Sequence, residues 1–201
     1  MPTTKSLPSH ASVIVIGIES DLTALRIAED HYRLFVGTTA IKRELAWLNN
    51  HKNGDESVEL IDSTSQYAVL GLMGPDASKI ARELGADALN ALKYFGVGEA
   101  HIAGCHVRAV RLSYVGEAGW EITCKAQNAT KIYDAMVALG AKPAGLFAQS
   151  SMRIEKKFLA YGHELDTDVS PLDAGLGFAV DWNKDFIGKG ALEKKKDAAL
   201  M

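Results

Sequence analysis

The sequence has few cysteines, no long apolar run and no strong excess of charge of either sign. Its 201 residues include only Cys105 and Cys124, too few for a disulfide scaffold or a four-ligand zinc site, so we expect two buried free thiols. Lys and Arg number 22 against 25 Asp and Glu, a net charge of −3, which argues against a basic nucleic-acid-binding protein. No apolar segment approaches the roughly 18 residues of a membrane span.

Several common site motifs are also missing. There is no HxxxH or HExxH pair, no GxGxxG or GxxxxGK[ST] loop and no GxSxG turn, which argues against zinc-protease, dinucleotide, P-loop and hydrolase sites. An EF-hand loop that started at Asp166 would need glycine at its sixth position and glutamate at its twelfth. Those positions hold Pro171 and Gly177, so we predict no metal site.

What is present is typical of a globular chain, with 47% hydrophobic and 23% charged residues. Residues 1–11 are polar, contain two prolines and are expected to form a tail. Residues 12–192 are expected to form one module, a single domain or two lobes that share a core, and residues 193–201 a basic helical tail. We expect a soluble intracellular protein, cytoplasmic or, in a eukaryote, in the mitochondrial matrix.

Hydrophobic periodicity predicts both strands and helices. Strands are expected at 12–18, 21–27, 31–36, 58–61, 67–73, 105–114 and 120–124, with irregular β structure at 94–103. Helices are expected at 39–48, with Thr38 or Thr39 as the cap, and at 77–84, 128–139, 146–157 and 191–200. This order predicts an α+β fold with mixed or antiparallel sheets and packed helices.

Three segments carry side chains suited to chemistry. The first is GIESDLT, residues 17–23, in which Asp21 follows a glycine-led bend between apolar runs. An aspartate that projects from such a bend can act as a base or stabilise a cation. The alternative is an ordinary turn aspartate that hydrogen-bonds its own backbone.

The second segment is SYVGEAGWE, residues 113–121, in which two glycines force a tight excursion between two strands. It offers Tyr114 and Trp120 as stacking walls and Glu117 and Glu121 as acceptors. A carboxylate can accept two hydrogen bonds from the amidine-like edge of a pterin or purine. The alternative is a glycine hairpin with solvated glutamates.

The third segment runs from Ser151 to Leu165 and contains Arg153 and Lys157 at helical spacing. A solvated charge run is the usual meaning of such a pattern. A single arginine that anchors an acidic ligand is the alternative.

Together with GLFAQSSMRIEKKFLAYGHEL, SPLDAGLGFAVDW and DFIGKGAL, these segments resemble the glycine cleavage T-protein superfamily of folate-dependent aminomethyltransferases. The likeness is greater to the C-terminal folate-binding module of dimethylglycine and sarcosine dehydrogenases, whose loop reads G-x-x-S-D. The resemblance runs from about Gly17 to Leu192. It implies the folate-binding lobes of the T-protein fold, without the C-terminal β-barrel.

The resemblance also implies a reaction, the transfer of a one-carbon unit to tetrahydrofolate to form 5,10-methylenetetrahydrofolate. It places the catalytic aspartate at Asp21, where it would stabilise an iminium and manage the proton of the attacking nitrogen. It places the pterin-binding glutamate at Glu121 and a pocket tyrosine at Tyr114. Glu117 and Arg153 match motif positions and are given supporting roles.

The chain departs from the family pattern at several points. Where T-proteins have a folate-contacting arginine, four residues before Arg153, this sequence has Gln149, which we keep in the expected folate site. A pocket asparagine is replaced by Gly37. The first part of the family's first lobe and its C-terminal barrel have no counterpart here, so self-association or a partner chain is expected to cover the faces that they would cover.

Three hypotheses therefore stay open. The chain is an aminomethyl-transfer module that takes its one-carbon donor from a lipoyl protein or a flavoprotein, or a non-catalytic folate-binding scaffold, or a truncated paralogue without a ligand. Gln149 and Gly37 favour the second. No flavin-binding fingerprint is present, so any oxidation would occur on another chain.

Overall fold

The structure, a computed structural model, describes residues 12–14, 17–52, 54 and 57–198, which excludes the expected tail at 1–11. The chain forms two compact units, which we describe one at a time. Of the described residues, unit 1 contains 25–33 and 61–158, and unit 2 contains 12–14, 17–24, 34–52, 54, 57–60 and 159–198. Among the described residues, no helix is long and apolar enough to cross a membrane.

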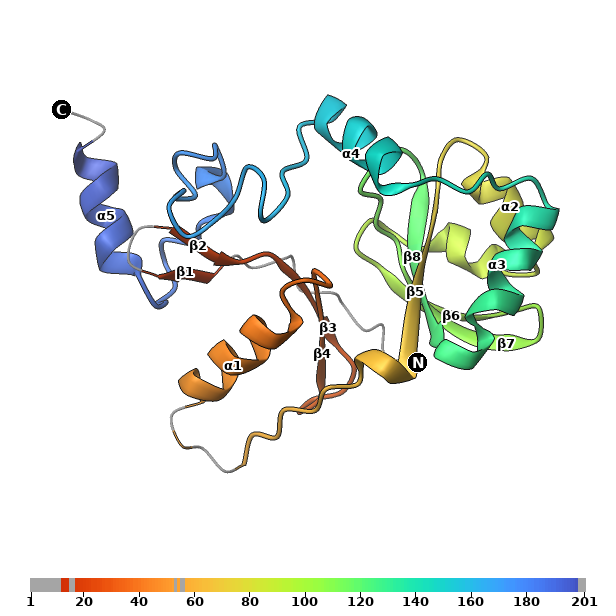
Figure 1. Ribbon diagram of the computed structural model, residues 1–201, viewed down its shortest axis with the longest axis horizontal. Helices are drawn as coiled ribbons and strands as arrows, with labels where there is room; N and C mark the ends of the chain where they lie inside the picture. Colours follow the sequence, from red (N-terminus) through yellow and green to blue (C-terminus); the bar gives the residue numbers. More distant parts are fainter. Residues whose placement is uncertain (1–11, 15–16, 53, 55–56, 199–201) are drawn as a thin grey trace. The chain divides into compact units, whose positions relative to one another are not determined.

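Unit 1 is built on a four-stranded antiparallel sheet (Figure 1). Its strands are β5 (Tyr67–Met73), β6 (Val97–Ile102), β7 (Cys105–Val110) and β8 (Gly119–Lys125), in the order β5-β8-β7-β6. Strand β5 has the predicted bounds. Strand β6 is regular where irregular structure was expected, because every one of its residues pairs with a residue of β7 across a tight turn.

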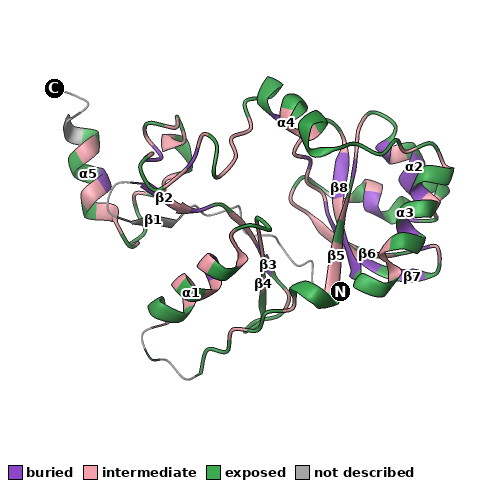
Figure 2. Ribbon diagram, viewed as in Figure 1, coloured by how far each residue is buried: buried purple, intermediate pink, exposed green. Residues whose placement is uncertain are grey.

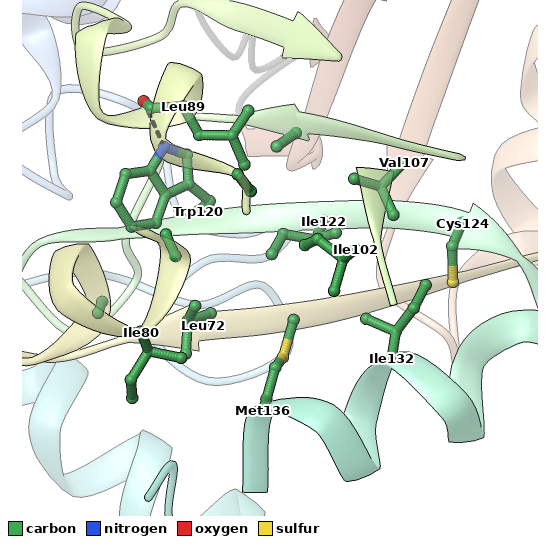
Figure 3. Packing of buried hydrophobic residues seen from close by; sticks show 14 of the residues in the cluster. Leu72, Ile80, Leu89, Ile102, Val107, Trp120, Ile122, Cys124, Ile132 and Met136 are labelled. Carbon is green, nitrogen blue, oxygen red and sulfur yellow. Dashed lines mark hydrogen bonds between the residues drawn. The ribbon is translucent and has the colours of Figure 1, made fainter. Parts of the chain in front are cut away.

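Two helices, α2 (Ala77–Glu83) and α3 (Ala129–Ala138), supply apolar side chains to the core that lies on one face of this sheet (Figures 1 and 3). Trp120 and Ile122 of β8 are fully buried and belong to the same core as Ile132 and Met136 of α3 (Figure 3). Figure 2 shows buried residues on β8 and α2. The Trp120 indole donates its N–H to the carbonyl of Leu89 at 3.1 Å, so its burial leaves no polar atom unsatisfied. The two cysteines are buried free thiols in this cluster, as predicted.

The remaining elements of unit 1 are shorter. Helix α4 spans Leu146–Glu155, and 3-10 turns lie at Thr64–Gln66, Asp87–Ala91 and Ala126–Asn128. Strands β3 (Leu22–Arg26) and β4 (Tyr32–Val36) pair with each other, and both contribute residues to each unit. The turn between them is closed by Ile27, whose N–H donates to the carbonyl of His31 at 2.8 Å.

Unit 2 contains a small antiparallel pair and two helices. Strand β1 (Ser12–Ile14) pairs with β2 (Gly17–Ser20), α1 spans Ile41–His51, α5 spans Lys189–Ala198, and a 3-10 turn lies at Gly177–Ala179. The predicted cap by Thr38 or Thr39 is wrong: Ala40 occupies the cap position without a side-chain hydrogen bond. The chain enters the helix through a backbone turn, in which Ala40 donates its N–H to the carbonyl of Gly37 at 2.9 Å.

The predicted strand at 58–61 is also wrong, since these residues belong to no strand of the described structure. The Ile61 side chain is 69% exposed, so an extended segment here would gain little from burial. Between residue 158 and the start of α5, the described chain consists of turns, the 3-10 turn at Gly177–Ala179 and one isolated bridge between Tyr161 and Leu165.

Gly17 allows a loop of unit 2 to lie directly on β2. Ile18 donates its N–H toward the carbonyls of Asp166 and Val169, at 2.9 and 3.0 Å. A Cβ atom on Gly17 would lie 1.7 Å from the carbonyl oxygen of Thr167. That approach is impossible for any other residue without moving backbone, so this glycine holds the loop against the strand that leads to Asp21.

We therefore expect Gly17→Ala to lower the free energy of unfolding by about 3 kcal/mol or more, because the added methyl group must displace the backbone of the 166–169 loop. Urea denaturation followed by circular dichroism measures this. Gly37→Ala is the matched control, since a Cβ there would meet nothing within 4 Å, and its stability should change by less than about 1 kcal/mol. Equal midpoints for the two variants would contradict the close approach.

Candidate functional site

Asp21 lies in unit 2, at the single residue that separates β2 from β3. Ser20 before it is 3% exposed, whereas Asp21 itself is exposed. Nearby protein atoms still remove part of the water around its carboxyl group, and this partial burial raises the pKa of Asp21 above its ordinary value. Such a carboxylate is a better proton acceptor than a fully solvated one.

Glu121 lies in unit 1, at the centre of β8. The sheet register places it opposite Gly71 of β5 and Val110 of β7, on the face away from Trp120 and Ile122. Its side chain is half-buried, and no described residue donates a hydrogen bond to its carboxylate or forms an ion pair with it. Burial without a compensating partner raises the pKa of Glu121.

Gly71 leaves space beside this carboxylate. A Cβ atom on Gly71 would meet only the flexible end of the Met73 side chain, at 3.4 Å. The cross-strand neighbour of Glu121 therefore has no side chain that could cover or bind the carboxylate. A half-buried acceptor with an open neighbouring position is suited to a ligand that brings its own N–H donors.

The segment that precedes β8 packs against the end of α4. The Tyr114 ring stacks on Phe158, with ring centroids 6.1 Å apart and planes 14° apart. The Glu117 carboxylate lies 4.0 Å from the Lys156 ammonium group and is exposed. Gly116 has a positive φ of 74°, so the tight excursion that the two glycines predicted is present.

Helix α4 carries the two remaining predicted residues. Arg153 is 3% exposed and donates from Nη1 to the carbonyl of Phe158 at 3.0 Å. It therefore fixes the chain where α4 ends, in addition to any role toward a ligand. Gln149 is half-buried one helical turn earlier, on the same face of the helix.

The structure also adds a residue that the sequence analysis did not select, Tyr94. It belongs to an open pocket of about 520 Å³, which is lined by Leu92, Lys93, Tyr94, Arg111, Ser113, Glu117, Ala118 and Gly119. Burial, and second the charge of Glu121, raise the pKa of the Tyr94 hydroxyl, so the phenol lies close to this carboxylate. The adjacent aromatic residues Tyr94 and Phe95, directly before Gly96, are the sequence signal that could have indicated it.

Arg111 organises the backbone of this pocket. Its Nη1 donates to the carbonyls of Asn90 and Leu92, at 2.7 and 3.1 Å, and its guanidinium lies 5.5 Å from the centre of the Trp120 ring. Arg111 thus ties the chain before Tyr94 to the core of unit 1. In the described residues, no group of three His, Cys, Asp or Glu side chains could hold a metal ion.

Unit 1 therefore gathers Tyr94, Glu117 and Glu121 around β8, with Tyr114 and Arg153 both packed against Phe158, while Asp21 belongs to unit 2. A protein-family model described as the GCVT N-terminal domain matches residues 16–184 of this chain. The chain belongs to the GCVT N-terminal domain family.

Similar proteins agree with this assignment. The curated aminomethyltransferases of Anoxybacillus flavithermus (strain DSM 21510 / WK1) and Bacillus subtilis (strain 168) are each 38% identical over 188 residues, which cover 90% of this chain and 51% of the relative. The chain thus spans about half the length of these relatives. The crystal structure of glycine cleavage system aminomethyltransferase T from Bartonella henselae has a TM-score of 0.81 and 26% identity, and the match covers 98% of this chain and 54% of that one.

These matches confirm two predictions made from the GCVT sequence motifs. The family is the glycine cleavage T-protein superfamily, represented here by about half of its usual length. The fold is α+β with antiparallel sheets and packed helices, as in the N-terminal part of the T-protein fold.

Because burial raises the pKa of Glu121 above its ordinary value of 4.5, the folded protein binds a proton here at a pH where the unfolded chain has released it. The resulting stability is complete below about pH 4.5 and is lost as the pH rises through the folded pKa. We therefore expect Glu121→Gln to raise the melting temperature at pH 7.5, and this gain to disappear below about pH 4.5.

Differential scanning fluorimetry at several pH values measures this effect. Glu117→Gln is the matched control, because its exposed carboxylate contributes less than about 0.5 kcal/mol to stability. A Glu121→Gln protein that melts below wild type at pH 7.5 would show that Glu121 has a stabilising partner.

Proposed function

We propose that this chain binds tetrahydrofolate and transfers a one-carbon unit to it, forming 5,10-methylenetetrahydrofolate. One observation carries the proposal: the half-buried Glu121 carboxylate has no described partner and stands beside an open glycine position in a GCVT-family chain. A pterin supplies two adjacent N–H donors on one edge. Two hydrogen bonds from that edge would replace the hydrogen bonds to water that the Glu121 carboxylate loses on burial.

The other residues of unit 1 suit the same ligand. Tyr94 offers a ring that is 59% exposed in the pocket beside Glu121, and Tyr114 offers a second aromatic surface on the same excursion. Aromatic side chains of this kind hold a flat heterocycle by stacking. Gln149, Glu117 and Arg153 are proposed as supporting residues of this site.

Asp21 is proposed as the catalytic carboxylate. For an S-aminomethyl donor, the C–S and C–N bonds of the donor break, and its carbon becomes bonded to N5 and N10 of tetrahydrofolate. The two N–H protons leave folate: one goes to the sulfur, giving a thiol, and the other goes to the amino group, giving ammonia, which takes up a proton from solvent and is released as ammonium. A carboxylate with a raised pKa can stabilise the cationic iminium and accept a proton from the attacking nitrogen.

The donor is proposed to arrive on a lipoyl carrier protein, as the glycine cleavage relatives suggest, with a flavoprotein that releases an iminium as the alternative. A non-catalytic folate-binding role is a second candidate. It is favoured by Gln149 and Gly37, which stand where T-proteins have an arginine and an asparagine.

A thermal-shift titration with 5-formyltetrahydrofolate tests the binding step. At a concentration of 100 times Kd, wild type should gain about 2.7 kcal/mol, a rise of roughly 5 to 10 °C in Tm. Glu121→Gln should lose most of this shift, whereas Asp21→Asn should keep it. Glu155→Gln, an exposed carboxylate on α4, is the control that should behave as wild type.

Transfer is then measured as ammonium release from an aminomethylated lipoyl domain in the presence of tetrahydrofolate. Asp21→Asn should slow it by about 100-fold or more. Folate binding without transfer in wild type would favour the non-catalytic role. The absence of any shift in wild type would refute the proposal.

A further inference from the structure

The Arg43 side chain of α1 joins three segments of unit 2. Its Nη2 donates to the carbonyl of Glu19 at 2.6 Å and to the Glu44 carboxylate at 2.5 Å. Its Nη1 donates to the Tyr161 hydroxyl, and the guanidinium lies 4.4 Å from the centre of the Tyr161 ring. One planar group thereby ties the end of β2 to α1 and to the segment that follows residue 158.

The contact with Glu19 lies directly before Asp21. The Glu19 carbonyl is two residues upstream, and the Glu19 carboxylate is 3.8 Å from Nη1 of Arg43. Ser20, between the two, is 3% exposed and cannot rotate outward without giving up this burial. The backbone at Glu19 and Ser20 therefore sets the direction in which the Asp21 carboxylate projects.

Arg43 does not itself contact the Asp21 side chain in the described structure, and no function considered so far uses it. We propose that Arg43 is the positioning residue for Asp21, holding the end of β2 so that the carboxylate meets the reacting carbon and nitrogen of a bound folate. This inference rests on the proposed function of Asp21. Because a displacement of about 1 Å can cost 100-fold in rate, an anchor of this kind has a measurable effect on turnover.

Arg43→Lys is the most informative variant. Glu44 is 4% exposed, so complete loss of the cation would leave a buried carboxylate unpaired and endanger folding. Lysine keeps the charge for Glu44, but its single ammonium group lacks the planar fork that reaches Glu19 and Tyr161 together. We expect Kd for 5-formyltetrahydrofolate to stay within about 2-fold of wild type and turnover to fall by about 10- to 100-fold.

A double variant separates positioning from a general structural role. If Arg43 acts through Asp21, then Asp21→Asn with Arg43→Lys should turn over no more slowly than Asp21→Asn alone. A loss in the double variant equal to the product of the two single losses would overturn the inference. So would wild-type turnover in Arg43→Lys.

A second readout does not depend on activity. Carbon-13 NMR of labelled aspartate should show the pKa of Asp21 moving toward its ordinary value of 3.8 in Arg43→Lys, because a loosened strand end lets water reach the carboxylate. If Asp21→Asn leaves turnover unchanged, the proposed catalytic role of Asp21 fails, and this titration alone decides whether Arg43 positions it. An unchanged pKa would then refute the inference.

Two further variants guard against a folding defect. Arg43→Met combined with Glu44→Gln removes both charges together and should show the same loss of turnover as Arg43→Lys. Tyr161→Phe removes only the hydroxyl acceptor and keeps the ring under the guanidinium, so a smaller loss is expected. If the loss of turnover in these variants follows their loss of Tm, and does not depend on whether the contact with Glu19 is kept, the inference that Arg43 positions Asp21 is contradicted.

Discussion

Strand β8 pairs along both edges, with β5 on one side and β7 on the other, and this double pairing fixes which way each of its side chains points. The two-residue period of a strand sends Trp120 and Ile122 into the core against α3. The same period leaves Glu121 on the opposite face. A shift of the register by one residue would bury a carboxylate and expose an indole, so the core itself enforces the position of Glu121.

Partial burial of the Glu121 carboxylate costs free energy, because the group loses water and the folded chain gives it no replacement hydrogen bond from a described residue. Among the described residues, neither the Glu121 nor the Asp21 carboxyl group has a hydrogen-bond or ion-pair partner that offsets the loss of water, and burial raises the pKa of each. Two other carboxylates of unit 1 are paired: Glu99 lies 2.6 Å from Arg108, and Asp87 lies 3.2 Å from Arg82. Unpaired and partly buried acids are what a binding site retains when the missing donors come from the ligand.

Much of the fold follows from periodicity, but the failures have definite causes. Residues 67–73 form an uninterrupted run without a charged residue and become β5 over that range, because every one of them pairs with a residue of β8. Residues 58–61 also carry a strand-like composition, yet Ile61 finds no core to enter. The sequence of a short segment does not show whether a partner strand lies beside it. For a segment of four residues, the presence of that partner decides whether a strand forms.

The candidate site could be predicted only in part for a similar reason. Asp21, Tyr114 and Glu121 were selected from the GIESD and YVGEAGWE motifs, whose side chains suit folate chemistry. Tyr94 was missed because its proximity to Glu121 depends on tertiary structure. Arg111, just after β7, donates hydrogen bonds to the carbonyls of Asn90 and Leu92 and so fixes the segment that carries Tyr94. Arg153 was considered as a ligand anchor. Its hydrogen bond to the carbonyl of Phe158 could not be predicted, because it depends on the path that the chain takes after α4 ends.

The two carboxylates also differ in how they are held, and the difference explains the contacts around Asp21. Glu121 needs no side-chain anchor, since ladder hydrogen bonds fix its backbone from both neighbouring strands. Asp21 is the single residue between β2 and β3, and in the described structure it belongs to neither of the two-stranded ladders on its two sides, β1–β2 and β3–β4. Two contacts outside the strand ladders hold the backbone before Asp21 instead. Gly17 lets the 166–169 loop lie against β2, and Arg43 donates a hydrogen bond to the carbonyl of Glu19. An exposed carboxylate that must meet a substrate in one orientation requires such anchors, whereas a carboxylate whose only task is to remain solvated does not.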